Sequence, residues 1–196
     1  MTRFRSSIMK NNQEIEIKFR IENIRSLQRK LRAAGFRCVT TRTHELNTLY
    51  DLPGQVLRKR GDLLRLRKYG ETWILTHKNK GRTGRHKART EYETQVGDGA
   101  QMALILESLG YCATFIYEKF RAEWTDGRGH VVVDETPIGN VGEIEGSSRW
   151  IDSAATKLGI TSSQYITLSY TELFFAWKKE TKSAAKEMTF RTVRGE

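Results

Sequence analysis

Polar and apolar residues alternate along the first patterned stretch of the chain, residues 13–21 (QEIEIKFRI). Glu14, Glu16 and Lys18 fall on one side of this stretch, while the isoleucines and Phe19 fall on the other. A repeat of two residues is typical of a β-strand with one buried face. The pattern therefore predicts a strand, and it raises the question of what surrounds the charged side.

The same alternation, together with β-branched and aromatic residues, predicts seven more strands. They cover residues 37–51, 63–70, 71–79, 89–96, 111–124, 129–137 and 140–147. Short turns or single helices separate consecutive strands, which indicates a mostly antiparallel sheet. The stretch 56–62 is expected to be a plain connection, and the basic, glycine-bearing stretch 80–88 is expected to be a mobile loop.

Four segments are predicted to be helices, at residues 23–36, 98–110, 148–160 and 169–180. Asn23 is placed to cap the first helix and Gly35 to end it. Ser169 followed by Glu172 forms the capping-box pattern at the start of the last one. With about eight strands and three or four helices, the chain is predicted to be an α+β protein.

Ionisable residues recur at a spacing of two on six or seven of the predicted strands. Besides those of the first strand, they are Arg65 and Arg67, Lys78, Arg89, Glu91 and Glu93, Lys119 and Arg121, Asp134, and Glu143 and Glu145. One such strand would be interpreted as the solvated face of a sheet. The repetition favours another interpretation, because like charges on one strand repel and destabilise the sheet unless something neutralises them.

A polyphosphate with bound divalent metal would neutralise both kinds of charge. Mg²⁺ and Mn²⁺ bind carboxylate oxygens and substrate phosphates, and arginine forks bind phosphate oxygens. The charged faces would then converge inside a closed or nearly closed antiparallel barrel of eight strands, a tunnel with a charged interior. The apolar strand faces would point outward, and the helices would pack over them.

Length and composition fit one such domain. The chain has 196 residues, of which 38% are hydrophobic and 29% charged. We expect a flexible arm over residues 1–10, a single domain over 11–178 and a disordered tail over 179–196, where apolar residues become rare. No apolar run is long enough for a membrane helix, and no signal peptide is recognisable. The two cysteines are far apart, so reduced thiols and a cytoplasmic location are expected.

The formal net charge of +11 favours an anionic partner. Nucleic-acid binders usually combine basic patches with exposed aromatic residues, whereas the aromatic residues here mostly fall on the apolar strand faces. A small triphosphate is therefore favoured over nucleic acid or a membrane surface. An outward apolar strand face would also be able to support a homodimer.

Several of these residues occur in the order of a known family. The string EIEIK, with Glu14, Glu16 and Lys18, resembles the E-x-E-x-K signature of the CYTH domain, the triphosphate tunnel metalloenzymes. The strings RLR, THK, RTEYE, KFR, DET and EIE follow in the family's order, and the closing LSYTELF is similar to its C-terminal helix. The resemblance covers residues 13 to about 178. The stretch LYDLPG matches the family pattern only in part, which leaves the leaving group open.

The resemblance implies a tunnel that binds triphosphate with one or two Mg²⁺ or Mn²⁺ ions. The implied metal ligands are Glu14, Glu16, Glu143 and Glu145. The implied triphosphate-binding residues are Lys18, Arg65, Arg67, Lys78, Arg89, Lys119 and Arg121. The implied catalytic set is Glu14, Glu16, Lys18, Glu91, Glu93 and Asp134, of which the last three would position metal, water or basic side chains.

Two reactions stay open for such a tunnel. In a hydrolase, water attacks the terminal phosphorus of an inorganic, thiamine or nucleoside triphosphate. In a class IV adenylyl cyclase, the ribose 3′-hydroxyl of ATP attacks the α-phosphorus and pyrophosphate leaves. Positioning and charge stabilisation do most of the work in either case, and hydrolysis is favoured because it needs fewer special features. A protein that only binds polyphosphate or RNA 5′-triphosphate is a third interpretation.

Overall fold

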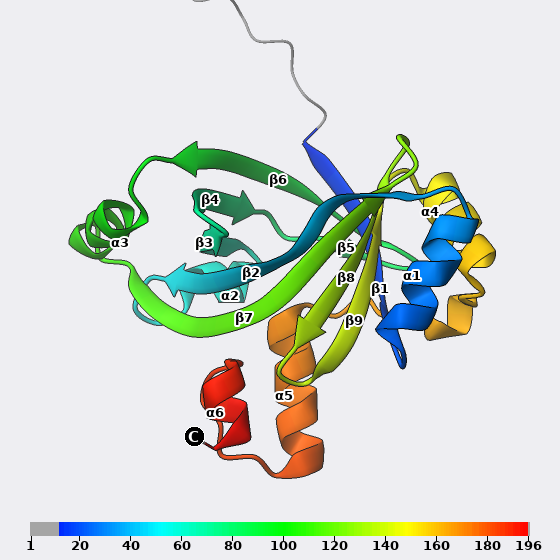
Figure 1. The fold of residues 1–196 in the computed structure, drawn as a ribbon. Helices are drawn as coiled ribbons and strands as arrows, with labels where there is room; N and C mark the ends of the chain where they lie inside the picture. Colours follow the sequence, from blue (N-terminus) through cyan, green and yellow to red (C-terminus); the bar gives the residue numbers. More distant parts are fainter. Residues whose placement is uncertain (1–11, 196) are drawn as a thin grey trace, which may run out of the picture.

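A single antiparallel sheet closes on itself to form the body of the molecule (Figure 1). The computed structural model describes residues 12–195, so the arm predicted over residues 1–10 lies outside the described part. The strands are β1 (Gln13–Arg20), β2 (Arg37–Asp51), β3 (Leu63–Tyr69), β4 (Thr72–Lys78), β5 (Arg82–Thr83), β6 (Lys87–Val96), β7 (Cys112–Thr125), β8 (His130–Thr136) and β9 (Gly139–Glu145).

Eight of these strands form the predicted closed barrel. Their order is β1-β9-β8-β7-β2-β3-β4-β6, and pairing of β1 with β6 closes the ring. The short strand β5 lies outside the ring and pairs only with β6. Register fixes the direction of each side chain, because neighbours along a strand point to opposite faces. Glu16 is opposite Glu145, and Lys18 is opposite Glu143, so charged residues of adjacent strands share the inner face.

Helices cover the outer face of the barrel, as predicted, with one exception. They are α1 (Ile24–Ala33), α2 (Val56–Arg60), α3 (Gly99–Ser108), α4 (Ser148–Leu158), α5 (Tyr170–Thr181) and α6 (Phe190–Arg194), with a 3₁₀ turn at Ser162–Gln164. The exception is α5, which packs at one end of the barrel on inner-face residues such as Phe115 and Tyr117. Asn23 caps α1 by accepting a hydrogen bond from the Ser26 amide at 2.9 Å. The predicted capping box of α5 is present, with the Ser169 amide donating to Glu172 Oε2 at 2.7 Å.

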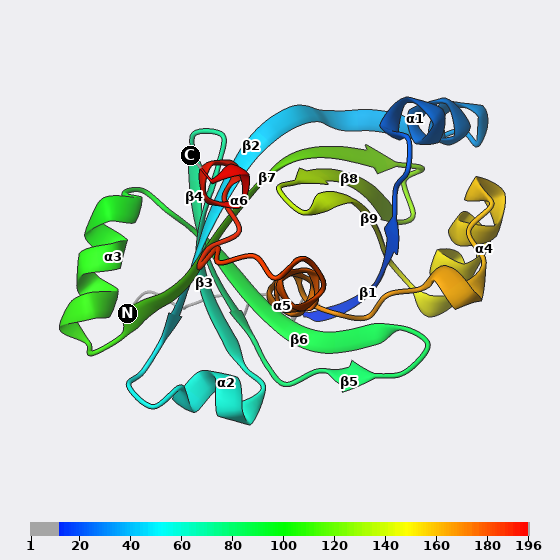
Figure 2. The same cartoon turned by 90° about the horizontal axis from the view of Figure 1, so that it is seen from below.

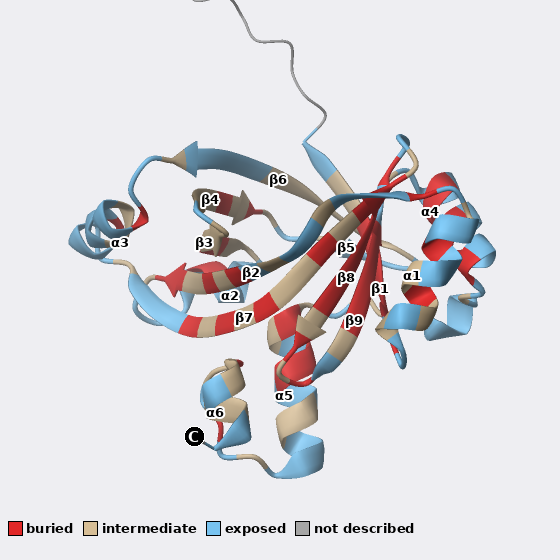
Figure 3. Cartoon of the chain, viewed as in Figure 1, coloured by how far each residue is buried: buried red, intermediate tan, exposed pale blue. Residues whose placement is uncertain are grey.

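The apolar strand residues form the core between barrel and helices. The largest cluster joins β1, β7, β8 and β9 to α1 and α4, and it includes Ile17, Trp124, Val131, Ile144 and Ile151. Figure 3 shows the buried stretches along these strands and on the turns of α4 and α5. The inside-out polarity predicted from the alternation is therefore confirmed. Burial of this apolar surface is the main driving force for folding.

One glycine on β9 allows an aromatic ring to lie against the barrel wall. Gly142 pairs with Phe19, and a Cβ atom at Gly142 would come within 2.1 Å of the Phe19 ring. Any other residue at this position would displace the ring from the core cluster.

Two connecting segments are more ordered than predicted. The stretch 56–62, expected to be a plain connection, contains α2, whose start is held by Asp51. That carboxylate accepts hydrogen bonds from the amides of Leu57 and Arg58 at 2.8 and 3.0 Å. The stretch 80–88, expected to be a mobile loop, contains β5, and Asp152 of α4 holds it through Arg85 and His86.

The predicted disordered tail is also wrong, because residues after 179 pack on the barrel. Met188 is fully buried among Tyr117, Leu173 and Phe174. Its amide donates to Ile116 O at 3.0 Å, which pairs this stretch with β7. The tail has few apolar residues, but those it has are placed on one existing apolar surface. Among residues 12–195, no helix is both long and apolar enough to cross a membrane.

Replacing Met188 with alanine tests whether the tail contributes to the core. We expect Met188→Ala to lower the free energy of unfolding by about 2 kcal/mol or more, since it removes a buried side chain and leaves a cavity. Urea denaturation followed by circular dichroism measures the change. Glu187→Ala, one residue earlier, is the control and is expected to change stability little. Equal stability of Met188→Ala and the parent would show that the tail does not pack.

Candidate active site

The inner face of the barrel surrounds a cavity of about 330 Å³. The ionisable residues that line it are Glu14, Glu16, Lys18, Arg65, Arg67, Lys78, Arg89, Glu93, Lys119, Arg121, Glu123, His130, Glu143 and Glu145. All seven cations predicted from the sequence are therefore brought together. Residues at the start of α5, among them Tyr170, also line the cavity, and Figure 2 shows α5 in front of the barrel when it is viewed from below.

The ionisable residues of the cavity fall into three groups. The first comes from strands β1 and β9 and consists of Glu16, Lys18 and Glu143. Lys18 Nζ lies 2.7 Å from Glu16 Oε1 and 3.4 Å from Glu143 Oε1. All three side chains are buried. Burial alone would lower the pKa of Lys18, but the charges of Glu16 and Glu143 outweigh it and raise that pKa. Lys18 is therefore charged, and it links two of the predicted metal ligands.

Glu14, at the start of β1, binds two cations from other strands. Lys78 Nζ of β4 lies 2.7 Å from Glu14 Oε1, and Arg89 Nε of β6 lies 3.2 Å from Glu14 Oε2. Lys78 also pairs with Glu91 Oε2 at 2.8 Å. Glu91 is not among the residues that line the cavity. Glu91 therefore holds Lys78 in position without contacting the cavity itself.

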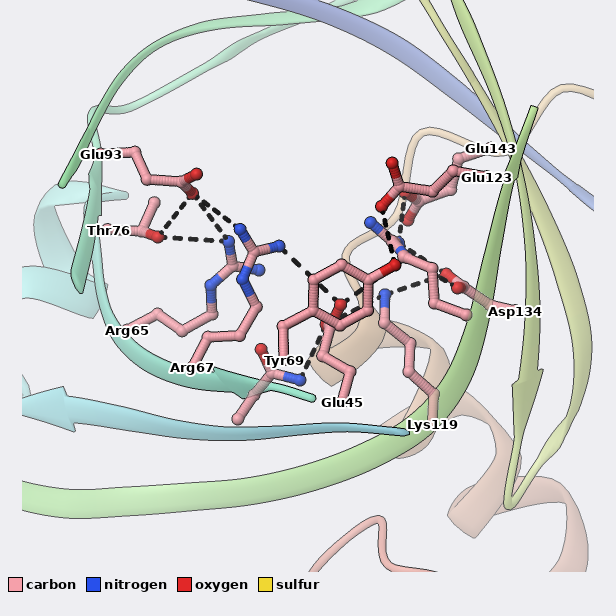
Figure 4. A network of polar contacts seen from close by, with 12 residues as sticks. Glu45, Arg65, Arg67, Tyr69, Thr76, Glu93, Lys119, Glu123, Asp134 and Glu143 are labelled. Carbon is pink, nitrogen blue, oxygen red and sulfur yellow. Dashed lines mark hydrogen bonds and ion pairs between the residues drawn. The ribbon is translucent and has the colours of Figure 1, made fainter. Parts of the chain in front are cut away.

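Asp134 organises a second group from β7, β8 and β9 (Figure 4). It is fully buried and accepts two hydrogen bonds from Arg121, at 2.8 and 2.6 Å, and one from Lys119 at 2.9 Å. The Tyr170 hydroxyl of α5 donates to the same carboxylate. Arg121 Nη2 also donates a hydrogen bond to Glu143 Oε2 at 2.7 Å. Asp134 does not line the cavity, so its direct role is to hold cations that do.

Arg65 and Arg67 form the third group, on β3 (Figure 4). Arg65 Nη2 donates to Thr76 Oγ1 at 3.3 Å, and Arg67 Nη2 donates to Glu93 Oε2 at 2.9 Å. The Nε atoms of both arginines are buried and have no hydrogen-bond partner among the described residues. Burial and the nearby charge of Arg65 lower the pKa of Arg67. Two adjacent cations with unused donors are suited to an anionic ligand.

Glu45 is a buried member of this network that the sequence analysis did not single out. It lies on β2, with Lys119 Nζ 3.4 Å away and Arg121 Nε 3.7 Å away. Burial alone would raise the pKa of Glu45, but Lys119 and Arg121 lower it well below its usual range. The signal was present in the sequence, since Glu45 and Asn47 have the spacing of two. It was obscured because threonines dominate the rest of that strand.

Tyr170, Tyr69 and His130 carried no comparable signal, whereas Glu123 shares the charged strand face of Lys119 and Arg121. Tyr170 lies beneath Lys119, whose Nζ is 4.2 Å from the ring centroid. The Tyr69 hydroxyl donates to Glu123 at 3.0 Å. His130 lines the cavity beside Glu145, its partner across β8 and β9. The two tyrosines and His130 are aromatic or single charged positions, so only the closed barrel shows that they meet the cluster.

Glu145, like Glu123, forms no ion pair within the described residues, whereas the other carboxylates that line the cavity all do, namely Glu14, Glu16, Glu93 and Glu143. Although solvent reaches the Glu145 side chain, partial desolvation by the surrounding wall and then the charges of Glu14 and Glu143 raise its pKa to about 7. A carboxylate beside other carboxylates is the local charge pattern that a bound cation would relieve. The donor set therefore fits a hard divalent metal, which prefers oxygen ligands. Among residues 12–195, however, no three metal-binding side chains already surround one point. Glu16 and Glu14 are instead paired with Lys18 and Lys78.

The comparison with known families agrees with this geometry. The CYTH domain matches residues 12–166. The chain belongs to the CYTH domain family. No functionally curated protein matches the chain.

Solved structures of the same fold extend this assignment. A Vibrio parahaemolyticus protein named as a candidate adenylate cyclase has a TM-score of 0.76 and 18% identity, over 85% of this chain and 99% of that chain. A Pyrococcus horikoshii protein has a TM-score of 0.70 and 23% identity, over 82% and 98%. A candidate adenylyl cyclase from Hippeastrum, described with a dominant triphosphatase activity, has a TM-score of 0.59 and 18% identity, over 83% and 95%. These similarities show that the CYTH barrel is shared.

The raised pKa of Glu145 makes stability depend on pH in metal-free protein. The folded state keeps this proton up to about pH 7, whereas the unfolded chain loses it near the ordinary glutamate pKa of 4.5, so stability falls as pH rises between the two. We expect Glu145→Gln to be more stable than the parent at pH 8 and no more stable at pH 4. The gain should be below about 1 kcal/mol because the side chain is exposed to solvent.

Thermal unfolding in EDTA at the two pH values measures this difference. Glu71→Gln, in the exposed turn between β3 and β4, is the charge-matched control. A gain at pH 8 that is equally large at pH 4 would contradict the explanation.

Proposed function

We propose that this CYTH protein is a divalent-metal-dependent phosphohydrolase that acts on a triphosphate inside the barrel. The observation that carries the proposal is the convergence of seven cations around one cavity of about 330 Å³. These cations come from β1, β3, β4, β6 and β7, so the barrel itself positions them. A triphosphate is a compact ligand with enough negative charge to use them all.

The cations would orient the phosphate chain from opposite walls. Arg65 and Arg67 project from β3, and Figure 4 shows Lys119 of β7 on the opposite side of the network. Arg121 lies on the same strand as Lys119 and also lines the cavity. Hydrogen-bond donors placed in advance around a phosphoryl group stabilise the charge that develops during its transfer. Asp134 and Glu45 keep these donors in place, so little reorganisation would be needed on binding.

Glu14, Glu16 and Glu145, with Glu143 nearby, would hold the divalent metal. A bound Mg²⁺ or Mn²⁺ supplies charge neutralisation of phosphate oxygens and a means to activate water. Glu14 and Glu16 would be freed for this role when Lys78 and Lys18 transfer from these carboxylates to phosphate oxygens. This exchange gives Glu14, Glu16, Lys18 and Lys78 a partner of opposite charge both before and after binding.

Conversion of ATP to cyclic AMP is the alternative that the same charges would serve. The name of the Vibrio parahaemolyticus protein is compatible with it, and the Hippeastrum protein is described with triphosphatase activity as dominant. We favour hydrolysis because it requires only an activated water, whereas cyclisation also requires the ribose to be held in a defined orientation.

A substrate panel tests the proposal. Purified protein with Mg²⁺ or Mn²⁺ is expected to release phosphate from inorganic, thiamine or nucleoside triphosphate, and EDTA is expected to stop the release. Phosphate is measured colorimetrically, and cyclic AMP is measured by chromatography in the ATP reactions. Cyclic AMP without phosphate release would establish the alternative. Failure of every triphosphate with both metals would overturn both activities.

Glu16→Gln tests the metal site. We expect kcat/KM to fall by more than roughly 100-fold, because loss of even an outer partner of a metal ligand commonly costs 10- to 100-fold. Circular dichroism should show an unchanged fold. Glu22→Gln, in the turn after β1, is the matched control and should keep full activity. Retained activity of Glu16→Gln would assign the carboxylate a structural role only.

Arg65→Ala tests the phosphate contacts. Hydrogen bonds to charged groups contribute about 1.5–3 kcal/mol each, so the KM for triphosphate should rise roughly 10- to 100-fold. Arg65→Lys should recover only part of this loss, because lysine lacks the planar fork. An unchanged KM in Arg65→Ala would remove Arg65 from the binding set.

A further inference from the structure

A second cavity, of about 530 Å³, adjoins the tunnel at the end where α5 begins. The two cavities share part of their walls, namely Leu49, Leu63, Arg89, Ser169 and Thr171. A ligand held by Arg89 in the tunnel is therefore next to the second cavity. Neither the family's match to residues 12–166 nor the seven tunnel cations explain what this space holds.

Four basic residues in the wall of the second cavity have no carboxylate partner among residues 12–195. They are Arg58 of α2, Lys80, Lys87 of β6, and Lys186 of the C-terminal segment. None of their side chains forms an ion pair with a described residue; Arg58 only lies over the Phe175 ring, at 5.6 Å. Lys87 is half-buried, and burial together with the charges of Arg89 and Lys18 lowers its pKa. The charges of Glu16 and Glu172 act on Lys87 without forming an ion pair with it, and Arg58, Lys80 and Lys186 are exposed to solvent.

The acidic residues in the same wall are already engaged elsewhere. Asp51 accepts hydrogen bonds from three backbone amides, including that of Leu57 at 2.8 Å. Asp62 binds Arg60 at 2.8 Å and the Lys80 amide. Glu172 accepts from the Ser169 amide and hydroxyl at 2.7 Å as part of the α5 capping box. These contacts fix the local fold and leave the cavity with an excess of positive charge.

We propose that the second cavity binds the phosphate groups that follow the third in a linear phosphate chain whose first three lie in the tunnel. This proposal deepens the proposed function, on which it rests, by naming the substrate class as a phosphate chain of four or more units. A neutral group would leave the four cations unpaired. A further phosphate would continue the line of positive charge from Arg89 to Lys87 and on to Lys80 and Lys186.

One wall of this cavity comes from the C-terminal segment, which lies outside the residues that match the family. Lys186 follows α5 and lies beyond residue 166, where the family's match ends. The burial of Met188 places the segment that carries Lys186 against the barrel. The packed tail therefore gives the protein one wall of the second cavity, and with it a means to prefer longer phosphate chains.

Binding of phosphate chains of different length tests the proposal. The probes are inorganic tripolyphosphate, inorganic tetraphosphate and adenosine 5′-tetraphosphate, and calorimetry in EDTA measures their dissociation constants without turnover. Binding without metal is expected to be weaker for every probe, so the affinities are compared between chain lengths and between variants. The test variant is the full chain with Lys80→Gln and Lys186→Gln. The control carries Lys157→Gln and Lys179→Gln, the same loss of charge at exposed positions that line neither cavity.

The parent is expected to bind tetraphosphate more tightly than tripolyphosphate. The test variant should lose about tenfold in tetraphosphate affinity and less than twofold in tripolyphosphate affinity, while the control loses neither. A loss for inorganic tetraphosphate alone assigns the cavity to an inorganic chain, and a loss for both tetraphosphates assigns it to any fourth phosphate; both results support the proposal.

Equal losses for tripolyphosphate and tetraphosphate, or no loss for either, would overturn it. The outcome is separable from that of the proposed function. A protein that shows the selective loss but hydrolyses no triphosphate with Mg²⁺ or Mn²⁺ would keep this binding site and lose the proposed enzymatic activity. Hydrolysis of triphosphate without the selective loss would leave the enzyme and remove the second site.

Discussion

Charge neutralisation inside a closed barrel is the constraint on which the rest of the structure depends. Closing the sheet turns one face of every strand toward a small interior, and in this chain that face is charged on nearly all strands. A buried charge without a partner is very unfavourable. The register of the strands solves this problem by placing opposite charges together, as in the pairing of Lys18 with Glu16 and Glu143. The apolar residues must then face outward, where helices α1 and α4 cover one apolar cluster and helices α2 and α3 cover another.

Much of the fold could be predicted from the alternation of polar and apolar residues. This alternation depends only on neighbouring residues, and it directly reflects the two faces of each strand. The strand at residues 37–51 is predicted with the bounds that β2 has, and the eight-stranded closure follows from where the charged faces occur. The tail was mispredicted for a different reason. Its stability comes from a few residues such as Met188 that dock on a surface formed by distant parts of the chain, and no local pattern reveals that surface.

The site residues that could be predicted are those that belong to the repeated spacing of two charged residues along a strand. All seven predicted cations line the cavity because each lies on a strand whose parity the sequence shows. Asp134 and Glu91 share that parity, yet they do not line the cavity, because each is covered by the cations with which it pairs. Glu45 and Tyr170 became recognisable only in the closed structure, where β2 and α5 meet Lys119. Sequence spacing thus predicts which face of the sheet a side chain lies on, but it does not predict which residue that side chain contacts.

The same neutralisation constrains how ligands bind. The tunnel cations already have carboxylate partners, so a triphosphate entering alone would leave Glu14, Glu16 and Glu143 as unpaired buried anions. A divalent cation entering alone would displace Lys18 and Lys78 from those carboxylates and leave the lysines unpaired. Entry of both together restores every pairing, because the lysines move to phosphate and the carboxylates to metal. Binding of anion and metal is therefore expected to be mutually reinforcing, and linkage makes that coupling equal in both directions.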